Sequence, residues 1–228
     1  MLCVPWQWRT VLRKYLAAAL LIAGMLSPGI ASAAAPAQKF AYTIHHSRYG
    51  RIGSYTNTVT RSGDDTTVST EIKIAVSILG VTLFRQDASR QERWSGGRLI
   101  NFHGVTTTNG RPIQLDGAAQ GDQFVMKTPE GEAIAPADVR LANPWSTAIL
   151  AGKAMFTPDR GRLDEVQVKG GETVMLPLGR KQVRAKKYDV LLLDGRKKYE
   201  VDIDDQGTTV QFVLFNIDGT SVTFSMDN

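Results

Sequence analysis

The stretch DASRQERWSGGRLINFHGVTTTNGRPIQLDG, residues 87–117, predicts three antiparallel strands joined by two tight turns. The dipeptides Gly96-Gly97 and Asn109-Gly110 accept positive φ at both positions, as two-residue hairpin loops require. Residues that suit strands flank both dipeptides. This part of the chain is therefore expected to form a β-meander, and the two turns allow the register of its strands to be argued.

The two turns place particular residues opposite one another. With Gly96-Gly97 as the first turn, Arg90 lies opposite His103, and the second turn places His103 opposite Asp116. Directly opposed residues lie side by side on one face of a sheet. We therefore expect a polar row of Arg90, His103 and Asp116 on one face. The other face is expected to carry Ile100, Phe102, Ile113 and Leu115, and the same register pairs Trp94 with Leu99, Glu92 with Asn101 and Thr106 with Ile113.

The first 33 residues have the pattern of a cleaved signal peptide. A basic segment without acidic residues precedes an apolar run over residues 15–26, and Ala31-Ser32-Ala33 has the small-x-small pattern that signal peptidase cleaves. The apolar run is shorter than the roughly 20 residues that a bilayer span needs, and no later stretch reaches that length. We expect cleavage near Ala33, no transmembrane segment in the mature chain, and a periplasmic or secreted location.

The domain plan that follows is simple. The signal peptide occupies residues 1–33, an Ala-, Pro- and Gln-containing linker residues 34–38, and a single β domain residues 39–228. A domain of this length is within the range that one all-β fold can fill.

Composition argues against two classes of protein. Cys3, the only cysteine, lies in the signal peptide, so the mature chain has no thiol for a disulfide or a metal. This fits a bacterial periplasm or exterior better than a disulfide-dense eukaryotic secreted domain. The net charge of +5 falls to +2 without the signal peptide, with 24 basic residues against 22 acidic ones. We therefore expect no nucleic-acid partner, because such binding needs a concentrated positive surface.

Strand patterns continue to the end of the chain. Apolar and polar residues alternate over residues 68–76, and turn signals recur about every eight to twelve residues. One helix is expected, with Asn143 as its N-cap, Pro144 in its first position and an end before Pro158. The predicted fold is all-β: a curved antiparallel meander closing toward a barrel, with one short helix packed on it.

Three segments resemble an exported bacterial family described only as a domain of unknown function. They are ASRQERWSGGRLINFHGVTTTNGR (88–111), RGRLDEVQVKGGETV (160–174) and YEVDIDDQGTTVQFVLF (199–215). The pattern W-x-x-G-R-L followed by T-x-x-N-G carries the resemblance, which extends over nearly all of the mature chain. The resemblance implies a mostly β protein of the cell envelope, and it carries over no catalytic residue.

The row of Arg90, His103 and Asp116 is the sharpest constellation for chemistry. A carboxylate beside an imidazole orients its tautomer, and a nearby arginine can hold an anion, so the row suits acid–base work or anion binding. A solvent-facing row of complementary charges explains the same residues. Because no nucleophile motif such as G-x-S-x-G is present, we do not expect an enzyme. A hydrolase using His103 and Asp116 is the second alternative function.

No cofactor or metal is expected. His45 and His46 are neighbours on a strand and therefore face opposite sides, and the chain has only three histidines and no cysteine after the signal peptide. DIDDQG at residues 202–207 lacks the ligand pattern of a calcium loop, so a hairpin turn explains it better. No phosphate loop or dinucleotide fingerprint is present.

Basic residues gather between residues 180 and 198. They suit either anionic lipid headgroups or the solvated face of strands.

The leading functional prediction is a non-catalytic envelope module that binds an apolar or lipid-like ligand. An aromatic residue on a short helix would close one mouth of a β cavity, although a core anchor is the more common role of such a residue. The first alternative is a periplasmic interaction or structural module that presents a sheet face or edge to an envelope protein. The ligand-binding candidates are Trp145, Ile149, Phe102, Tyr188, Phe212 and Phe224.

Overall fold

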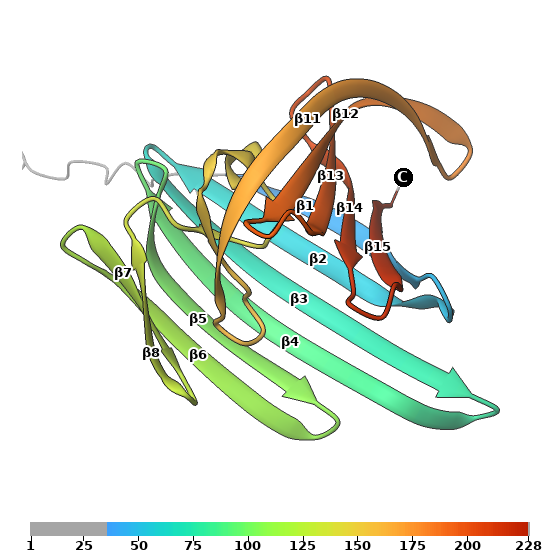
Figure 1. The fold of residues 1–228 in the computed structure, drawn as a ribbon, viewed down its shortest axis with the longest axis horizontal. Helices are drawn as coiled ribbons and strands as arrows, with labels where there is room; N and C mark the ends of the chain where they lie inside the picture. Colours follow the sequence, from blue (N-terminus) through green and yellow to red (C-terminus); the bar gives the residue numbers. More distant parts are fainter. Residues whose placement is uncertain (1–35, 228) are drawn as a thin grey trace, which may run out of the picture. The chain divides into compact units, whose positions relative to one another are not determined.

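The computed structural model describes residues 36–227, so the expected signal peptide and its cleavage site lie outside the described residues. Within this part of the chain, all strands join one curved sheet in the order β8-β7-β6-β5-β4-β3-β2-β1-β15-β14-β13-β12-β11-β10-β9. Neighbouring strands are antiparallel, except for the parallel pair β9 and β10. The prediction of an all-β, curved antiparallel fold is confirmed (Figure 1).

The first half of the chain is a meander in which each strand pairs with the next. Its strands are β1 (Ala37–His46), β2 (Gly50–Ser62), β3 (Asp65–Ile78), β4 (Val81–Ser95), β5 (Arg98–Thr108), β6 (Arg111–Gln120), β7 (Gln123–Thr128) and β8 (Gly131–Pro136). β1 begins within the stretch expected as a linker, because Ala37 and Gln38 already pair with Thr60 and Val59 of β2.

The second half forms the other wall of the sheet. It consists of β9 (Arg140–Leu141), the 3₁₀ helix η1 (Thr147–Ala151), β10 (Ala154–Phe156), β11 (Leu163–Leu178), β12 (Lys181–Leu192), β13 (Lys197–Asp204), β14 (Thr209–Phe215) and β15 (Ser221–Met226). β15 pairs with β1, so the last strand extends the sheet that the first strand began.

The sheet curls without closing. Its two edges are β8 and β9, which follow one another in the chain and are linked by residues 137–139. Because this link is so short, one end of β8 lies near the start of β9 even though the two strands do not pair. The β11–β12 hairpin arches over β13–β15 (Figure 1). The result resembles a barrel whose last seam is missing.

The register predicted around the two turns is correct for one turn and shifted beside the other. His103 lies opposite Asp116, as predicted from the Asn109-Gly110 turn. Beside Gly96-Gly97, Trp94 lies opposite Leu99 as expected, but a β-bulge at Ile100 then moves the pairing by one residue. A shift of one residue moves side chains to the other face of a strand.

The predicted polar row is therefore wrong at Arg90, whereas His103 and Asp116 lie side by side as predicted. Arg90 pairs with Gly104 instead of His103, and Glu92 pairs with Phe102 instead of Asn101. Arg90 and Glu92 lie on the buried face, 6% and 1% exposed. The predicted apolar face is correct for Phe102 and Leu115 in the core and for Ile113 packed against it, whereas Leu99 takes the core position expected for Ile100.

The helix expected from Asn143 is also wrong in extent. Only the single turn η1 forms, and its N-cap is Ser146, whose Oγ accepts a hydrogen bond from the Ala148 backbone N–H at 3.2 Å. Asn143 is instead buried, 3% exposed, and its side chain bonds to strand residues. The side chain of Asn143 takes part in a tertiary hydrogen-bond network, so it does not form the N-cap that local propensity predicts.

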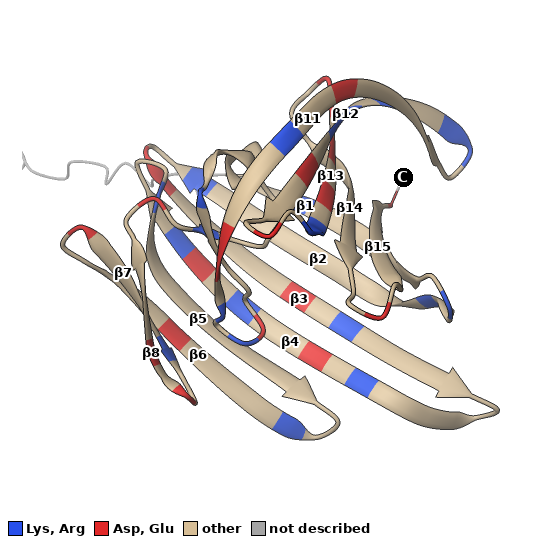
Figure 2. Ribbon diagram, viewed as in Figure 1, with Lys and Arg blue, Asp and Glu red and all other residues tan. Residues whose placement is uncertain are grey.

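Charged residues of both signs lie along β3 and β4 (Figure 2). Glu71, Lys73, Arg85 and Arg93 are exposed, while their strand neighbours of opposite parity are mostly buried or half-buried. Arg85 forms an ion pair with Asp87 at 2.7 Å. The outer face of the meander is thus solvated, and the inner face carries the core.

Half of the basic cluster expected between residues 180 and 198 is neutralised by nearby acids. Ion pairs join Lys187 to Glu200, Lys197 to Asp189 and Glu200, Arg196 to Asp194, and Lys198 to Asp164. This favours a solvated strand surface over a site for lipid headgroups. Among the described residues, no helix is long and apolar enough to cross a bilayer.

Candidate functional site

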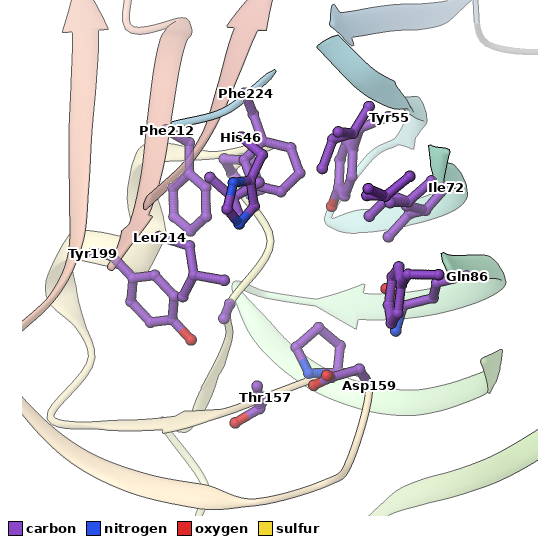
Figure 3. Close-up of a pocket in the computed structure, with 18 of the residues that line it drawn as sticks. His46, Tyr55, Ile72, Gln86, Thr157, Asp159, Tyr199, Phe212, Leu214 and Phe224 are labelled. Atoms are coloured by element: carbon purple, nitrogen blue, oxygen red, sulfur yellow. The ribbon is translucent and has the colours of Figure 1, made fainter. Parts of the chain in front are cut away.

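The concave side of the sheet holds a pocket of about 560 Å³ (Figure 3). Tyr55 of β2 and Ile72 of β3 stand on one side, and they face Tyr199, Phe212 and Phe224 from β13–β15. The segment between β9 and β11 closes the floor with Thr157 and Asp159. This volume lies in the range of about 300–1,000 Å³ that small-molecule sites occupy.

Apolar side chains make up most of the pocket lining. Ile72, Ile74 and Val76 point inward from β3 because alternate residues of a strand share one face. Leu214 and Val222 contribute from the facing wall, and both are only partly buried. A surface of this kind favours an apolar occupant, because contact with it removes apolar area from water.

The pocket reaches the end of the sheet where the β1–β2 and β3–β4 turns lie. Tyr49 and Leu83 line it there while 43% and 55% exposed. Beyond them, Leu79 is 99% exposed at a positive φ of 50°. An apolar ligand arriving from solvent at this end would meet apolar side chains from the turns inward.

A buried network of polar side chains lies beside the pocket and is centred on Asn143. Its Oδ1 accepts hydrogen bonds from the Tyr55 hydroxyl at 2.7 Å and the Asn57 amide at 2.8 Å, and its Nδ2 donates to Glu92. The Thr70 hydroxyl donates to Asn57 Oδ1 at 2.6 Å. The network joins β2, β3 and β4 to the segment before η1, so it fixes that segment against the concave face.

Glu92 is the acidic member of this network. Its Oε2 accepts hydrogen bonds from the indole N–H groups of Trp94 at 2.8 Å and Trp145 at 2.9 Å. Burial raises the pKa of Glu92, while the hydrogen bonds from Asn143 and the two indoles and the charge of Arg90 oppose that rise. The oxygens of Glu92 are thus occupied by donors of the protein itself.

Arg90 is the one arginine among the described residues that line the pocket. It lies on the inner face of β4, 6% exposed, and its Nε is buried without a hydrogen-bond partner. Burial lowers the pKa of this guanidinium, and Tyr55, Asp159 and Glu92 act in the opposite direction. An arginine nonetheless stays charged in proteins, so the pocket contains a cation whose hydrogen-bonding capacity is not fully used.

Asp159 is the acidic side chain in the same lining. It lies between β10 and β11 with its side chain 32% exposed, and its Oδ2 is 3.9 Å from Arg160 Nε. Its Oδ1 is buried and has no hydrogen-bond partner. The pocket therefore presents one cationic donor and one anionic acceptor among otherwise mostly apolar side chains.

Two of the six predicted ligand-binding residues line this pocket, namely Phe212 and Phe224. Trp145 instead packs edge-on against Trp94 and donates its N–H to Glu92, so it is a core anchor. Ile149 and Phe102 are buried in apolar clusters. Tyr188 lies on β12, outside the pocket, and packs partly buried against the apolar cluster that contains Val201 and Phe212.

The residues of β2–β4 were missed as pocket residues by sequence reasoning. Phe84, Gln86 and Arg90 line the pocket from β4, and they share the parity of the core residue Trp94. That shared parity was the available signal. Counting from the Gly96-Gly97 turn without the bulge places Arg90 on the polar face instead.

His103 and Asp116 form a pair on the outer face, with His103 Nδ1 2.7 Å from Asp116 Oδ1 and side chains 52% and 48% exposed. The hydrogen bond from His103, followed by one from Gln114, lowers the pKa of Asp116. A hollow of about 570 Å³ borders the pair, and Thr67 is the only hydroxyl-bearing residue in its lining. A solvated cross-strand pair explains this geometry without chemistry.

The sequence DIDDQG forms the turn between β13 and β14. Asp204 Oδ1 accepts hydrogen bonds from the backbone N–H groups of Gln206 at 2.9 Å and Thr208 at 2.8 Å. The hairpin-turn interpretation is therefore confirmed for this segment. Within residues 36–227, no three His, Cys, Asp or Glu residues are grouped as metal ligands would be.

A strongly curved sheet that holds a pocket but leaves its seam open defines a β-barrel-like protein. The chain belongs to the family described as Domain of unknown function (DUF6134), whose model matches residues 42–227. The resemblance to an uncharacterised family, noted from three sequence segments, is thereby confirmed. No curated protein was found to match the chain.

One solved structure shows the same class of fold. A β-barrel-like protein of the domain of unknown function DUF1849 from Brucella abortus is 13% identical, with a TM-score of 0.57 over 86% of this chain and 98% of its own. A DUF1089 family protein from Pseudomonas aeruginosa is 13% identical with a TM-score of 0.35, covering 78% of this chain and 91% of its own. At 13% identity, the first likeness establishes the fold alone.

Proposed function

We propose that this protein is an exported binding module that holds an apolar or lipid-like ligand on the concave side of its sheet. The observation that carries the proposal is the pocket of about 560 Å³ between β2–β4 and β13–β15, with its mostly apolar lining. Side chains beside an unfilled space lose van der Waals contacts, which an apolar occupant would restore. Export is supported by the signal-peptide pattern of residues 1–33.

A pair of neighbouring variants tests this proposal. Ile74 lines the pocket and is half-buried, whereas Ala75 is exposed on the opposite face of β3. Ile74→Trp should narrow the pocket and weaken binding of the neutral apolar probe N-phenyl-1-naphthylamine about tenfold or more, because the indole occupies part of the probe's space. Ala75→Trp adds the same ring outside the pocket and should bind the probe as the wild type does.

Fluorescence titration of the probe measures both affinities, and circular dichroism checks that both variants keep the β fold. Equal binding by the wild type, Ile74→Trp and Ala75→Trp would show that the probe binds elsewhere and would contradict the proposal. Failure of the wild-type protein to bind the probe at all would contradict it as well.

The alternative functions have weaker support. An interaction module that uses a sheet edge has little support at β8, because this short edge strand carries Glu132 and ends at Pro136, features that discourage strand addition. A hydrolase using His103 and Asp116 needs a nucleophile beside the pair, and the hollow there offers only the hydroxyl of Thr67. The concave pocket remains the feature that best supports a function.

A further inference from the structure

Arg90 places a positive charge inside the pocket. The folded chain does not supply all the hydrogen-bond and ion-pair partners that this side chain can bind. The residue is 6% exposed, its Nε has no hydrogen-bond partner, and none of the ion pairs among residues 36–227 includes it. A buried charge without a partner is costly, because it has lost its hydration and gained nothing equivalent. Such a group on a pocket wall is a feature that an anionic ligand would satisfy.

The surroundings of Arg90 leave room for its long side chain. Gly104 lies directly opposite on β5, and a Cβ atom there would come within 3.3 Å of Arg90 Cγ and 2.9 Å of Phe102 Cζ. The glycine therefore lets the aliphatic part of Arg90 and the Phe102 ring pack against the backbone of β5. The guanidinium is held by this packing instead of by a protein carboxylate.

The nearby acids do not take the place of a ligand. Both oxygens of Glu92 accept hydrogen bonds from protein donors, namely Asn143, Trp94 and Trp145. Asp159 lies beyond ion-pair distance of Arg90, and one of its oxygens is itself unpartnered. Its negative charge on the pocket floor stabilises the cation only from a distance.

We propose that the pocket binds an aliphatic chain with a carboxylate at one end, and that this carboxylate pairs with Arg90 while the chain lies between β3 and β14–β15. The inference rests on the binding function proposed above and names the class of ligand. A planar guanidinium matches one carboxylate through two parallel hydrogen bonds. A doubly charged phosphate fits less well, because the lining offers one arginine and the charge of Asp159 opposes further negative charge.

Three probes with the same chain separate the head group from the tail: dodecanoate, dodecanol and dodecyltrimethylammonium, each titrated calorimetrically below its micelle concentration. The wild-type protein should bind dodecanoate about tenfold or more tightly than dodecanol, and the cation most weakly, because only the carboxylate gains charge-assisted hydrogen bonds. Dodecyl phosphate serves as a fourth probe and should bind less tightly than dodecanoate.

Two variants assign the preference to residues. Arg90→Met keeps an unbranched side chain and removes the charge, so dodecanoate and dodecanol should bind it equally. Asp159→Asn removes the opposing charge, so the preference for dodecanoate should increase. Arg90→Lys keeps a positive charge but lacks the planar guanidinium, so it should retain a smaller preference for dodecanoate over dodecanol. This variant provides the test if Arg90→Met does not fold.

The outcomes distinguish this inference from the binding function on which it rests. Tight binding of both dodecanoate and dodecanol, with the same affinities in the wild type and Arg90→Met, overturns the carboxylate assignment and leaves an apolar pocket. Tighter binding of dodecyl phosphate than of dodecanoate also overturns it. Failure of all four probes to bind the wild type contradicts the binding function itself.

Discussion

At the scale of single residues, the burial of Asp202 on β13 makes the free energy of unfolding of this protein depend on pH. The residue is 0% exposed; its Oδ2 accepts a hydrogen bond from Gln211 at 3.2 Å, and its Oδ1 has no partner. Burial raises the pKa of Asp202 to about 6, and the charge of Glu200 adds to this rise, while Lys187 opposes it. Between its ordinary value of 3.8 and about 6, the folded protein therefore binds more protons than the unfolded one.

The sign of the effect follows directly. The stabilisation from a protonated Asp202 is fully present below the unfolded-state pKa and is lost as the pH rises through about 6. Asp202→Asn has no carboxyl group to titrate, so the variant should not lose this stabilisation as the pH rises. The free energy of unfolding of the variant relative to the wild type should therefore increase by about 1–3 kcal/mol from acidic to neutral pH.

Urea unfolding at roughly pH 4, 5 and 7 measures this difference, since the pH range brackets the shift. Asp205→Asn, an exposed position in the next turn, controls for the loss of one negative charge. A difference between Asp202→Asn and the wild type that is the same at every pH would contradict the account of Asp202.

Arg90 marks the limit of residue-level prediction from the sequence. The Asn109-Gly110 turn allowed the pairing of His103 with Asp116 to be predicted correctly, because nothing interrupts the ladder between β5 and β6. The extra residue at the Ile100 bulge reversed the face of Arg90. No turn residue signals that bulge, so the most informative side chain of the pocket was assigned to the solvent.

At the scale of elements, the segment from Asn143 to η1 depends on tertiary hydrogen bonds more than on helix capping. Asn143→Ala removes bonds to Tyr55, Asn57 and Glu92 and leaves buried groups unsatisfied. The free energy of unfolding should fall by about 2–4 kcal/mol. Ser146→Ala removes only the N-cap of one turn and should cost about 1 kcal/mol or less.

Denaturant unfolding of the two variants measures both costs under the same conditions. If Ser146→Ala proved as damaging as Asn143→Ala, capping would dominate and the role given to the buried network would be wrong.

A second element, β11, shows why glycine pairs are ambiguous in a sequence. Gly170-Gly171 has the composition of a hairpin turn, yet β11 runs through it with a bulge and pairs with β12 on both sides. Both glycines have positive φ, 111° and 107°, and a Cβ at Gly170 would lie 2.6 Å from the Lys187 backbone oxygen. Positive φ occurs both in turns and in bulges, so only the pairing with the neighbouring strand distinguishes the two.

At the scale of the whole described unit, the pocket exists because β1 pairs with β15. This pairing brings β13–β15 beside β1 so that the curved sheet faces itself across the concave side. Local periodicity predicted the strands, their antiparallel order and two of the aromatic lining residues, Phe212 and Phe224. It contains no information on which distant strands meet. Parity could therefore place residues of β2–β4 on the inner face, but not opposite β13–β15.

The central claim is that this pocket holds an amphiphile with an acidic head. Native mass spectrometry of the mature protein, recovered from a periplasmic extract without detergent or delipidation, tests it most directly when paired with organic extraction. The account predicts a discrete added mass that extracts as a long-chain carboxylic acid and is lost in Ile74→Trp. A bare protein mass in every preparation, with nothing in the organic extract, would contradict the claim.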